Sequence, residues 1–260
     1  QVWQIRCAEF CPTSYLEIRP TLRLMDFLKK YGAYLLVGIL AFAQYANTFK
    51  HDYAWDDAIV ITENSRVQKG LTDVPELFEN IKTSKTEHKY GYRPISLLSF
   101  ATDIQLFGLD PHAGHVMNAL YYALLCVFIL YFLNVLFPGN PMQMLLVTLL
   151  FVVHPMHTEV VANIKSRDEI LTMFFGLAEL LMLRRFIDRF SVVSILLAIV
   201  FFACGFLSKE NAITFCGIAL VLPFFVDSKL TRNHWITIGV GAISVAVLLL
   251  IRSFVYSERF

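Results

Sequence analysis

The residues able to do chemistry lie in three short stretches, and the first holds two adjacent carboxylates, Asp56 and Asp57. Neighbouring carboxylates repel each other unless water, a cation or a ligand offsets their charge. A carboxylate is also a common general base for activating a hydroxyl group. A solvated loop, or a helix N-cap, where Asp is favoured, would explain the pair without any chemistry. The spacing alone leaves both interpretations open.

Further along the same polar stretch, Arg93 stands in the sequence Tyr-Gly-Tyr-Arg-Pro. Proline is favoured at the first position of a helix, so we expect a helix to begin at Pro94. The planar guanidinium of Arg93 suits either a phosphate or an anchoring position at a membrane surface. Both roles remain open for this residue.

The second stretch, residues 154–169, is a dense group of ionisable side chains between two apolar runs. Metal binding by its histidines and Glu159 is one interpretation, although the spacing is not the His-Glu-x-x-His of zinc hydrolases. A phosphate or sugar pocket is a more natural use of His, Lys and Arg together. A wet interfacial loop is the third interpretation. The residues concerned are His154, His157, Glu159, Lys165, Arg167, Asp168 and Glu169.

The third stretch is the sequence Ser-Lys-Glu-Asn, which contains Lys209 and Glu210 between two apolar runs. A structural ion pair is one interpretation of the two adjacent charges. However, so short a loop lies close to the bilayer, where charged residues usually have a function. The sequence therefore offers a structural and a functional interpretation of this pair.

The composition indicates what kind of molecule must position these residues. Apolar residues make up 57% of the chain, phenylalanine occurs 23 times, and the mean hydropathy is +0.58. A soluble domain of this length carries more charge, so the chain is expected to be embedded in a lipid bilayer. The net charge of +1 gives no basis for a nucleic-acid partner. The cysteine spacing suggests neither a disulfide framework nor a structural zinc site.

Seven apolar runs are separated by polar segments, and we expect about seven transmembrane helices in an all-α polytopic membrane protein. A crossing helix needs about 20 residues, so the shorter runs require flanking residues. The sequence Pro-Gly-Asn-Pro at 138–141 predicts a tight turn between two helices. Residues 1–30 are expected to form a cytoplasmic or interfacial segment, and 31–260 the transmembrane domain. The runs are 31–49, 115–137, 142–153, 170–186, 192–207, 212–226 and 235–256.

Basic residues in the short loops predict the orientation, because Lys and Arg are enriched on the cytoplasmic side of membranes. If the first run starts in the cytoplasm and each later run crosses once, one set of basic residues falls on that side. The three reactive stretches, with the loop of about residues 50–111, then share the external face. The basic set is Lys29, Lys30, Arg184, Arg185, Arg189, Lys229 and Arg232.

The reactive residues also form an ordered series that resembles a known family. The series resembles the membrane half of the transmembrane and tetratricopeptide-repeat O-mannosyltransferases and their bacterial relatives, and more loosely the GT-C protein O-mannosyltransferases. The resemblance covers about residues 31–230, and its most specific part is the sequence His-Pro-x-His-Thr-Glu. The series comprises Asp56-Asp57, Arg93-Pro94, Gly108-x-Asp110-Pro111-x3-His115-x2-Asn118, residues 154–169, and Ser208-Lys209-Glu210.

The resemblance implies a GT-C-like helix bundle whose external first loop carries short helices. The implied activity is transfer of a sugar, with mannose the first expectation, from a polyprenyl phosphate to a hydroxyl acceptor on protein Ser/Thr or on a glycan. Asp56 or Asp57 would be the general base. No cofactor is assigned, and a divalent metal ion remains an option. Residues implied to bind the donor phosphate or sugar are Arg93, His154, His157, Glu159, Lys165, Arg167, Lys209 and Glu210.

The chain also departs from the family pattern. Ser166 stands where relatives often have Gly, and no repeat of about 34 residues follows the last apolar run. The transmembrane domain is therefore expected to be incomplete at its C-terminus, and a non-catalytic subunit or truncated remnant is the alternative to an enzyme. Transport is the less favoured alternative, because Glu179 is the main ionisable residue in mid-span. A bacterial inner membrane and the endoplasmic reticulum would give equivalent topology.

Overall fold

The computed structural model describes residues 30–78, 90–226 and 231–257. Within these ranges the regular structure is helical and contains no β-strand, which confirms the expected all-α class. The expected N-terminal segment lies almost entirely outside the described residues, as do Lys29 and Lys229.

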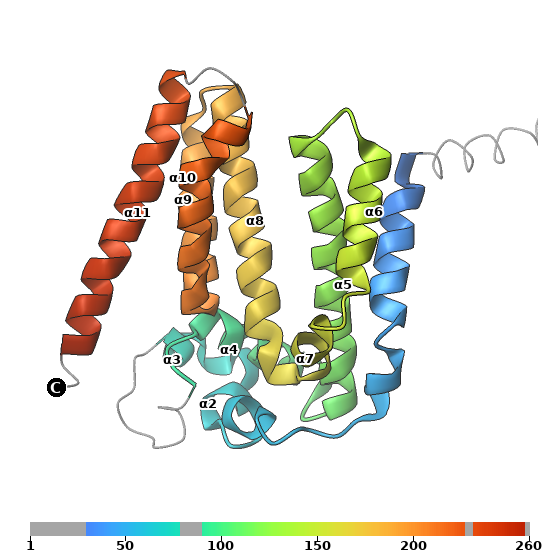
Figure 1. Cartoon of the computed structure of the whole chain (residues 1–260). Coiled ribbons are helices and arrows are strands. Elements are labelled where there is room, and N and C mark those ends of the chain that lie inside the picture. Colours follow the sequence, from blue (N-terminus) through green and yellow to red (C-terminus); the bar gives the residue numbers. More distant parts are fainter. Residues whose placement is uncertain (1–29, 79–89, 227–230, 258–260) are drawn as a thin grey trace, which may run out of the picture.

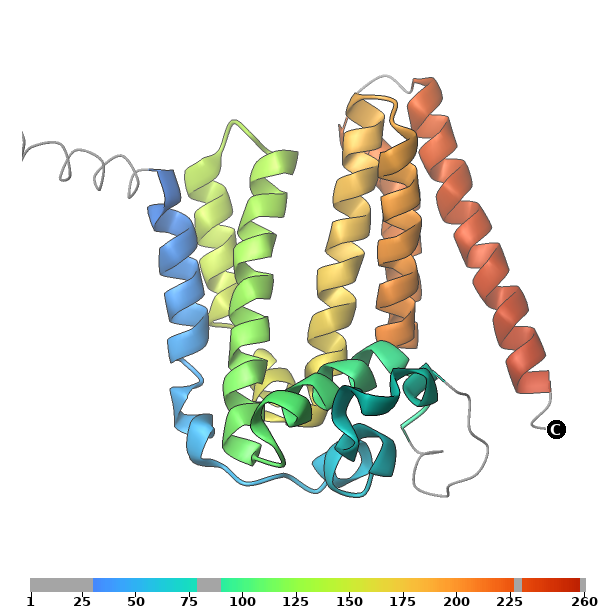
Figure 2. The ribbon, with the colours of Figure 1, turned by 180° about the vertical axis from the view of Figure 1, so that it is seen from behind.

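Each of the seven predicted apolar runs forms a helix, and successive long helices run in alternating directions (Figures 1 and 2). By length and composition, two helical segments of the described ranges are able to cross a membrane, namely Lys30–Lys50 and α5. The prediction of about seven crossings therefore stays a prediction. The helices are 30–43, α5 (Pro111–Leu136), α6 (Pro141–Val152), α8 (Arg167–Asp188), α9 (Val192–Ser208), α10 (Ile213–Val226) and α11 (Arg232–Ser257).

The long helices form two groups that are joined where α5 packs on α8. The first helix, α5 and α6 make one group, and α8 to α11 make the other. Buried aliphatic and aromatic side chains, such as Val37, Leu130 and Leu183, fill a shared core. Gly176 allows α10 to approach α8 closely, because a Cβ there would lie 2.4 Å from the ring of Phe215. A larger residue would require the helices to separate or the Phe215 ring to move.

A layer of short helices lies at one end of the bundle, at the bottom of Figure 1. It has its own apolar core, which includes Val60, Val67, Phe100 and Ile164. The prediction that the first loop carries short helices is confirmed, and a helix begins at Pro94 as expected. The short elements are η1 (Ala46–Lys50), η2 (Ala58–Thr62), α2 (Ser65–Gln68), η3 (Gly70–Asp73), α3 (Val74–Phe78), α4 (Pro94–Phe107), α7 (His157–Ala162), η5 (Ile164–Ser166) and η6 (Glu210–Ala212).

The opposite end of the bundle holds a tight turn and the described members of the basic set that is predicted to be cytoplasmic. Residues 137–140 connect α5 to α6, as the Pro-Gly-Asn-Pro sequence predicts. Arg184 and Arg185 lie in the last turns of α8, Arg189 follows it, and Arg232 begins α11. The described part of the predicted cytoplasmic set is therefore gathered at one end, away from the layer of short helices (Figure 1).

Candidate functional site

The three reactive stretches meet at the layer of short helices in two groups of polar contacts, one around Lys165 and one around Asp168. The loop before α4, the segment from α7 to α8, and the turn from α9 to α10 all reach this end of the bundle (Figures 1 and 2). We call the two groups together the ionic cluster. Its members are Asp56, Asp57, Arg93, Lys165, Asp168, Glu169, Lys209 and Glu210.

Asp57 and Asp168 are both buried carboxylates of the cluster, and Asp57 has no exposed surface. Its two oxygens accept hydrogen bonds from the backbone N–H groups of Ala54 and Lys165, each at 2.8 Å. Burial raises the pKa of Asp57 above its usual range, although the two N–H groups act in the opposite direction. The carboxylate is thus fixed in orientation and is a stronger base than a solvated aspartate.

Asp56 differs from its neighbour because it is half-exposed, and its carboxylate pairs with the Lys165 ammonium at 3.2 Å. Lys165 therefore contacts both members of the acidic pair, Asp57 through its backbone and Asp56 through its side chain. This arrangement offsets the repulsion between the adjacent charges. Asp57 is therefore held in one orientation, whereas Asp56 is accessible to solvent.

Arg93 and Lys209 form the cationic part of the cluster. Arg93 pairs with Asp168 at 2.6 Å and with the exposed Glu210 at 3.4 Å, and its guanidinium lies 4.9 Å from the centre of the Tyr90 ring. Lys209 contacts Glu169 at 2.5 Å and Asp168 at 3.4 Å. The buried Nε of Arg93 has no hydrogen-bond partner. Asp168 is therefore the shared anion that holds the two cations close to each other.

His154 and His157 are not brought into the ionic cluster but lie in an aromatic group at the junction of α5, α6 and α7. The ring of His157 packs 4.2 Å from that of Phe151, and its Nδ1 lies 3.0 Å from the Tyr122 hydroxyl. Burial lowers the pKa of His157. His154 is exposed, 5.7 Å from the His157 ring between centroids, and Glu159 is exposed as well. Among the described residues, no group of three His, Cys, Asp or Glu side chains is placed to hold a metal ion.

Arg167 lies apart from the cluster, although the motif assigns it to donor binding. The side chain is fully buried, and its contacts are all with α4 and α5. Successive residues of a helix point about 100° apart, so Asp168 faces the cluster while Arg167 faces the bundle. The sequence supplies both charges but not the rotation of α8 that separates them.

Sequence reasoning assigned no role to two residues that contact Arg167, which are Asp103 and Asn118. Asn118 belongs to the series that resembles the family, and this resemblance is the signal that marks it as a candidate. Asp103 lies inside an apolar run, where a lone buried acid implies a partner. His115 is a third residue to which the sequence assigns no role, although it does not contact Arg167. It is buried, and its Nε2 lies 3.3 Å from the carbonyl oxygen of Asp52, near the acidic pair.

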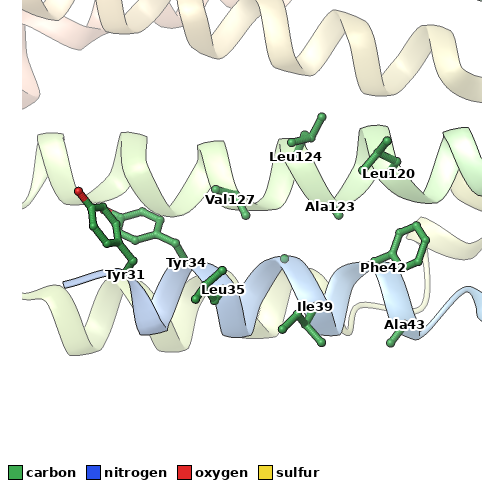
Figure 3. A pocket seen from close by; sticks show the side chains of 11 residues that line it. Tyr31, Tyr34, Leu35, Ile39, Phe42, Ala43, Leu120, Ala123, Leu124 and Val127 are labelled. Atoms are coloured by element: carbon green, nitrogen blue, oxygen red, sulfur yellow. The ribbon is translucent and has the colours of Figure 1, made fainter. Parts of the chain in front are cut away.

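An apolar groove of about 580 Å³ lies between the first helix and α5 (Figure 3). Leu35, Ile39 and Phe42 line it from one side, and Leu120 and Leu124 from the other. The side chains follow both helices over several turns, so the groove is elongated (Figure 3). Both walls belong to the two segments able to cross a membrane, and none of the ionic cluster residues lines the groove.

Within the described ranges, the molecule belongs to the class of all-helical bundles and has an ionic cluster at one end. Comparison with known proteins identifies its relatives. Protein O-mannosyl-transferase TMTC4 of Mus musculus is 31% identical over 231 residues, which cover 78% of this chain and 31% of the relative. TMTC1 of Mus musculus is 30% identical over 76% of this chain and 22% of its own length. The tmtc2 protein of Xenopus laevis is 32% identical, with 79% and 26% covered.

The chain is therefore a homologue of the TMTC protein O-mannosyl-transferases, as the motif series predicts. It spans about a third or less of the length of these relatives. No family model matches the sequence. No solved structure matches it either.

Proposed function

We propose that this chain forms the sugar-transfer site of a membrane glycosyltransferase of the O-mannosyltransferase type. The observation that carries the proposal is that three separate stretches meet at one end of the bundle, in an ionic cluster that contains a buried, oriented carboxylate. The relatives are named protein O-mannosyl-transferases, which supports mannose as the sugar and protein as the acceptor. The seven long helices would cross the bilayer, with the cluster on the external or luminal face.

Because Asp57 has no exposed surface, acceptor binding must first uncover one of its oxygens. Asp57 then takes the proton from the acceptor hydroxyl, and the hydroxyl oxygen attacks the anomeric carbon of the sugar. The bond between sugar and phosphate breaks, and its electron pair leaves with the polyprenyl phosphate. Arg93 and Lys209 stabilise the charge that develops on the leaving phosphate. The unpartnered Nε of Arg93 and the exposed position of Glu210 support this role, because the phosphate could replace Glu210 as the partner of Arg93.

The donor tail must lie in an apolar environment while its phosphate reaches the cluster. The groove between the first helix and α5 offers such an environment, since most of the side chains that line it are aliphatic or aromatic. Burial of hydrocarbon there would remove apolar surface from water in proportion to the area covered. The groove therefore supports a lipid-linked donor over a soluble sugar nucleotide.

A second candidate function is a non-catalytic membrane subunit, and one observation favours it. Arg93, Lys165 and Lys209 each have a carboxylate partner already. A network that neutralises itself in this way would hold the layer of short helices together without any ligand. Only a transfer assay separates this role from catalysis.

The test is sugar transfer in membranes from cells that express the chain, with radiolabelled polyprenyl-phosphate mannose as donor. A general base contributes about 100- to 10,000-fold to a rate, so Asp57→Asn should lower transfer by that range. Asp56→Asn should have a smaller effect, and the exposed loop variant Asp52→Asn is the matched control. Equal transfer by wild type and Asp57→Asn would reject the general base, and no transfer by wild type with any donor would favour the subunit.

A further inference from the structure

We propose that Arg167 and Asn118 are positioning residues that hold the turn at residues 161–166 where it orients the acidic pair. The inference rests on the proposed function only for the importance of that orientation. A set of buried polar side chains beneath the site, which we call the lock, fixes the backbone of Lys165. The lock consists of Arg167 on α8, Asp103 on α4 and Asn118 on α5.

Arg167 is held on every side by groups of α4 and α5. Its guanidinium pairs with Asp103 at 2.5 Å, and its Nε donates to the Asn118 side-chain oxygen at 2.7 Å. The ring centres of Phe100 and Tyr121 lie 4.7 and 5.0 Å from the guanidinium carbon. A planar group clamped at its edges and next to two rings has little rotational freedom. The first residue of α8 is thereby fixed to both neighbouring helices.

Asn118 connects this clamp to the turn. Its side-chain nitrogen lies within hydrogen-bond distance of three carbonyl oxygens, those of Val161 at 3.4 Å, Asn163 at 3.0 Å and Ile164 at 3.3 Å. The side-chain amide nitrogen of Asn118 therefore holds the backbone of the turn in place, while its side-chain oxygen accepts a hydrogen bond from Arg167. Buried polar groups satisfied in this way specify a single arrangement of the chain around them.

The turn also packs against α5 without free space. A Cβ on Gly114 would lie 2.8 Å from Cδ1 of Ile164, and the Ile164 side chain is fully buried. The turn therefore has one position along α5, set by apolar contact on one side and by Asn118 on the other. Lys165 follows directly, and from this position its N–H reaches Asp57 and its ammonium reaches Asp56.

The consequence is that the lock acts on Asp57 through a single backbone hydrogen bond. This bond from Lys165 is one of the interactions that lower the pKa of Asp57 against the effect of burial. Loosening the turn should weaken the bond, so the pKa of Asp57 should rise further. A role confined to stability would lower the amount of folded protein without moving the pH dependence of the remaining activity.

The experiment compares Asn118→Leu with Asn134→Leu, the same change on the same helix at its other end. Hydrogen exchange of the purified full chain is measured by mass spectrometry over residues 161–166 and 52–58. We expect faster exchange in both segments for Asn118→Leu and unchanged exchange there for Asn134→Leu. Arg167→Lys keeps the charge but loses the planar clamp, and should give the same result if Asn118→Leu does not fold.

Unchanged exchange of residues 161–166 in the folded variants would overturn the inference, whatever their activity. If wild type transfers sugar, the acid limb of its pH profile should move to higher pH in Asn118→Leu and stay in place in Asn134→Leu. An acid limb that stays in place while exchange becomes faster would also overturn it, because the turn would then not act on Asp57. Absence of transfer in wild type would reject the proposed function, and the exchange result would still decide whether the lock holds the turn.

Discussion

At the scale of the residue, burial distinguishes the two adjacent carboxylates. Asp57 is enclosed and accepts two backbone N–H groups, whereas Asp56 is half-exposed and pairs with a lysine. A general base works best when its pKa lies near the operating pH. Because burial raises the pKa of Asp57, this residue is the better suited of the two to accept a proton.

The pH dependence of transfer tests this assignment. A base accepts a proton only when it is deprotonated, so activity should fall as the pH drops through the pKa of Asp57. Since that pKa is raised, the acid limb should lie at higher pH than the value of about 4 typical of a solvated aspartate. The measurement is kcat/KM for transfer against pH, with stability followed in parallel. Activity that stays constant down to about pH 4 would contradict the assignment.

Sequence reasoning at this scale identified the residue types but not their surroundings. The topology predicted that Asp57, Lys165 and Lys209 share one end of the molecule, and they do. It could not predict that Arg167 points into the bundle, because one step along a helix turns a side chain by about 100°. Nor could it predict which aspartate is buried, since that depends on the path of the loop over α5.

At the scale of the element, hydropathy predicted the long helices well and the short ones only in outline. Apolar runs report burial directly, so the helix positions followed from composition. Each predicted run coincides with a long helix of the described chain. The break between α7 and α8 was harder to foresee, because it depends on the buried contacts of Asn118 and Ile164 with neighbouring helices.

The close approach of α8 and α10 gives a prediction at this scale. Gly176→Ala would place a Cβ 2.4 Å from the Phe215 ring, so the helices must separate or the ring must move. Overpacking of this kind costs about 1–3 kcal/mol. We expect a lower thermal unfolding midpoint in detergent than for wild type.

The matched control is Gly239→Ala on α11, where an added Cβ meets nothing within 4 Å. Alanine is favoured over glycine in a helix interior by about 1 kcal/mol, so this variant should be unchanged or slightly more stable. A similar stability for the two variants would show that the contact between α8 and α10 is looser than the structure indicates.

At the scale of the whole molecule, two ends of opposite character suggest how the bundle sits in a bilayer. One end carries the ionic cluster, and the other carries Lys30, Arg184 and Arg232 at helix termini. Basic residues favour the cytoplasmic side. Of the seven long helices, α6 is the shortest, and its 12 residues extend about 18 Å, against a hydrocarbon thickness of about 30 Å.

Labelling of the two ends of α6 tests the proposed topology at its most demanding point. Gly139 and Glu159 are both exposed and lie before and after α6, so each is replaced by cysteine in a chain whose natural cysteines are changed to serine. If α6 crosses with local thinning of the bilayer, a membrane-impermeant maleimide added to the external or luminal side should label Glu159→Cys at once. Gly139→Cys should react only after the membrane is permeabilised. Labelling of both positions from the same side would mean that α6 does not cross, and the proposed orientation of the helices after it would then be reversed.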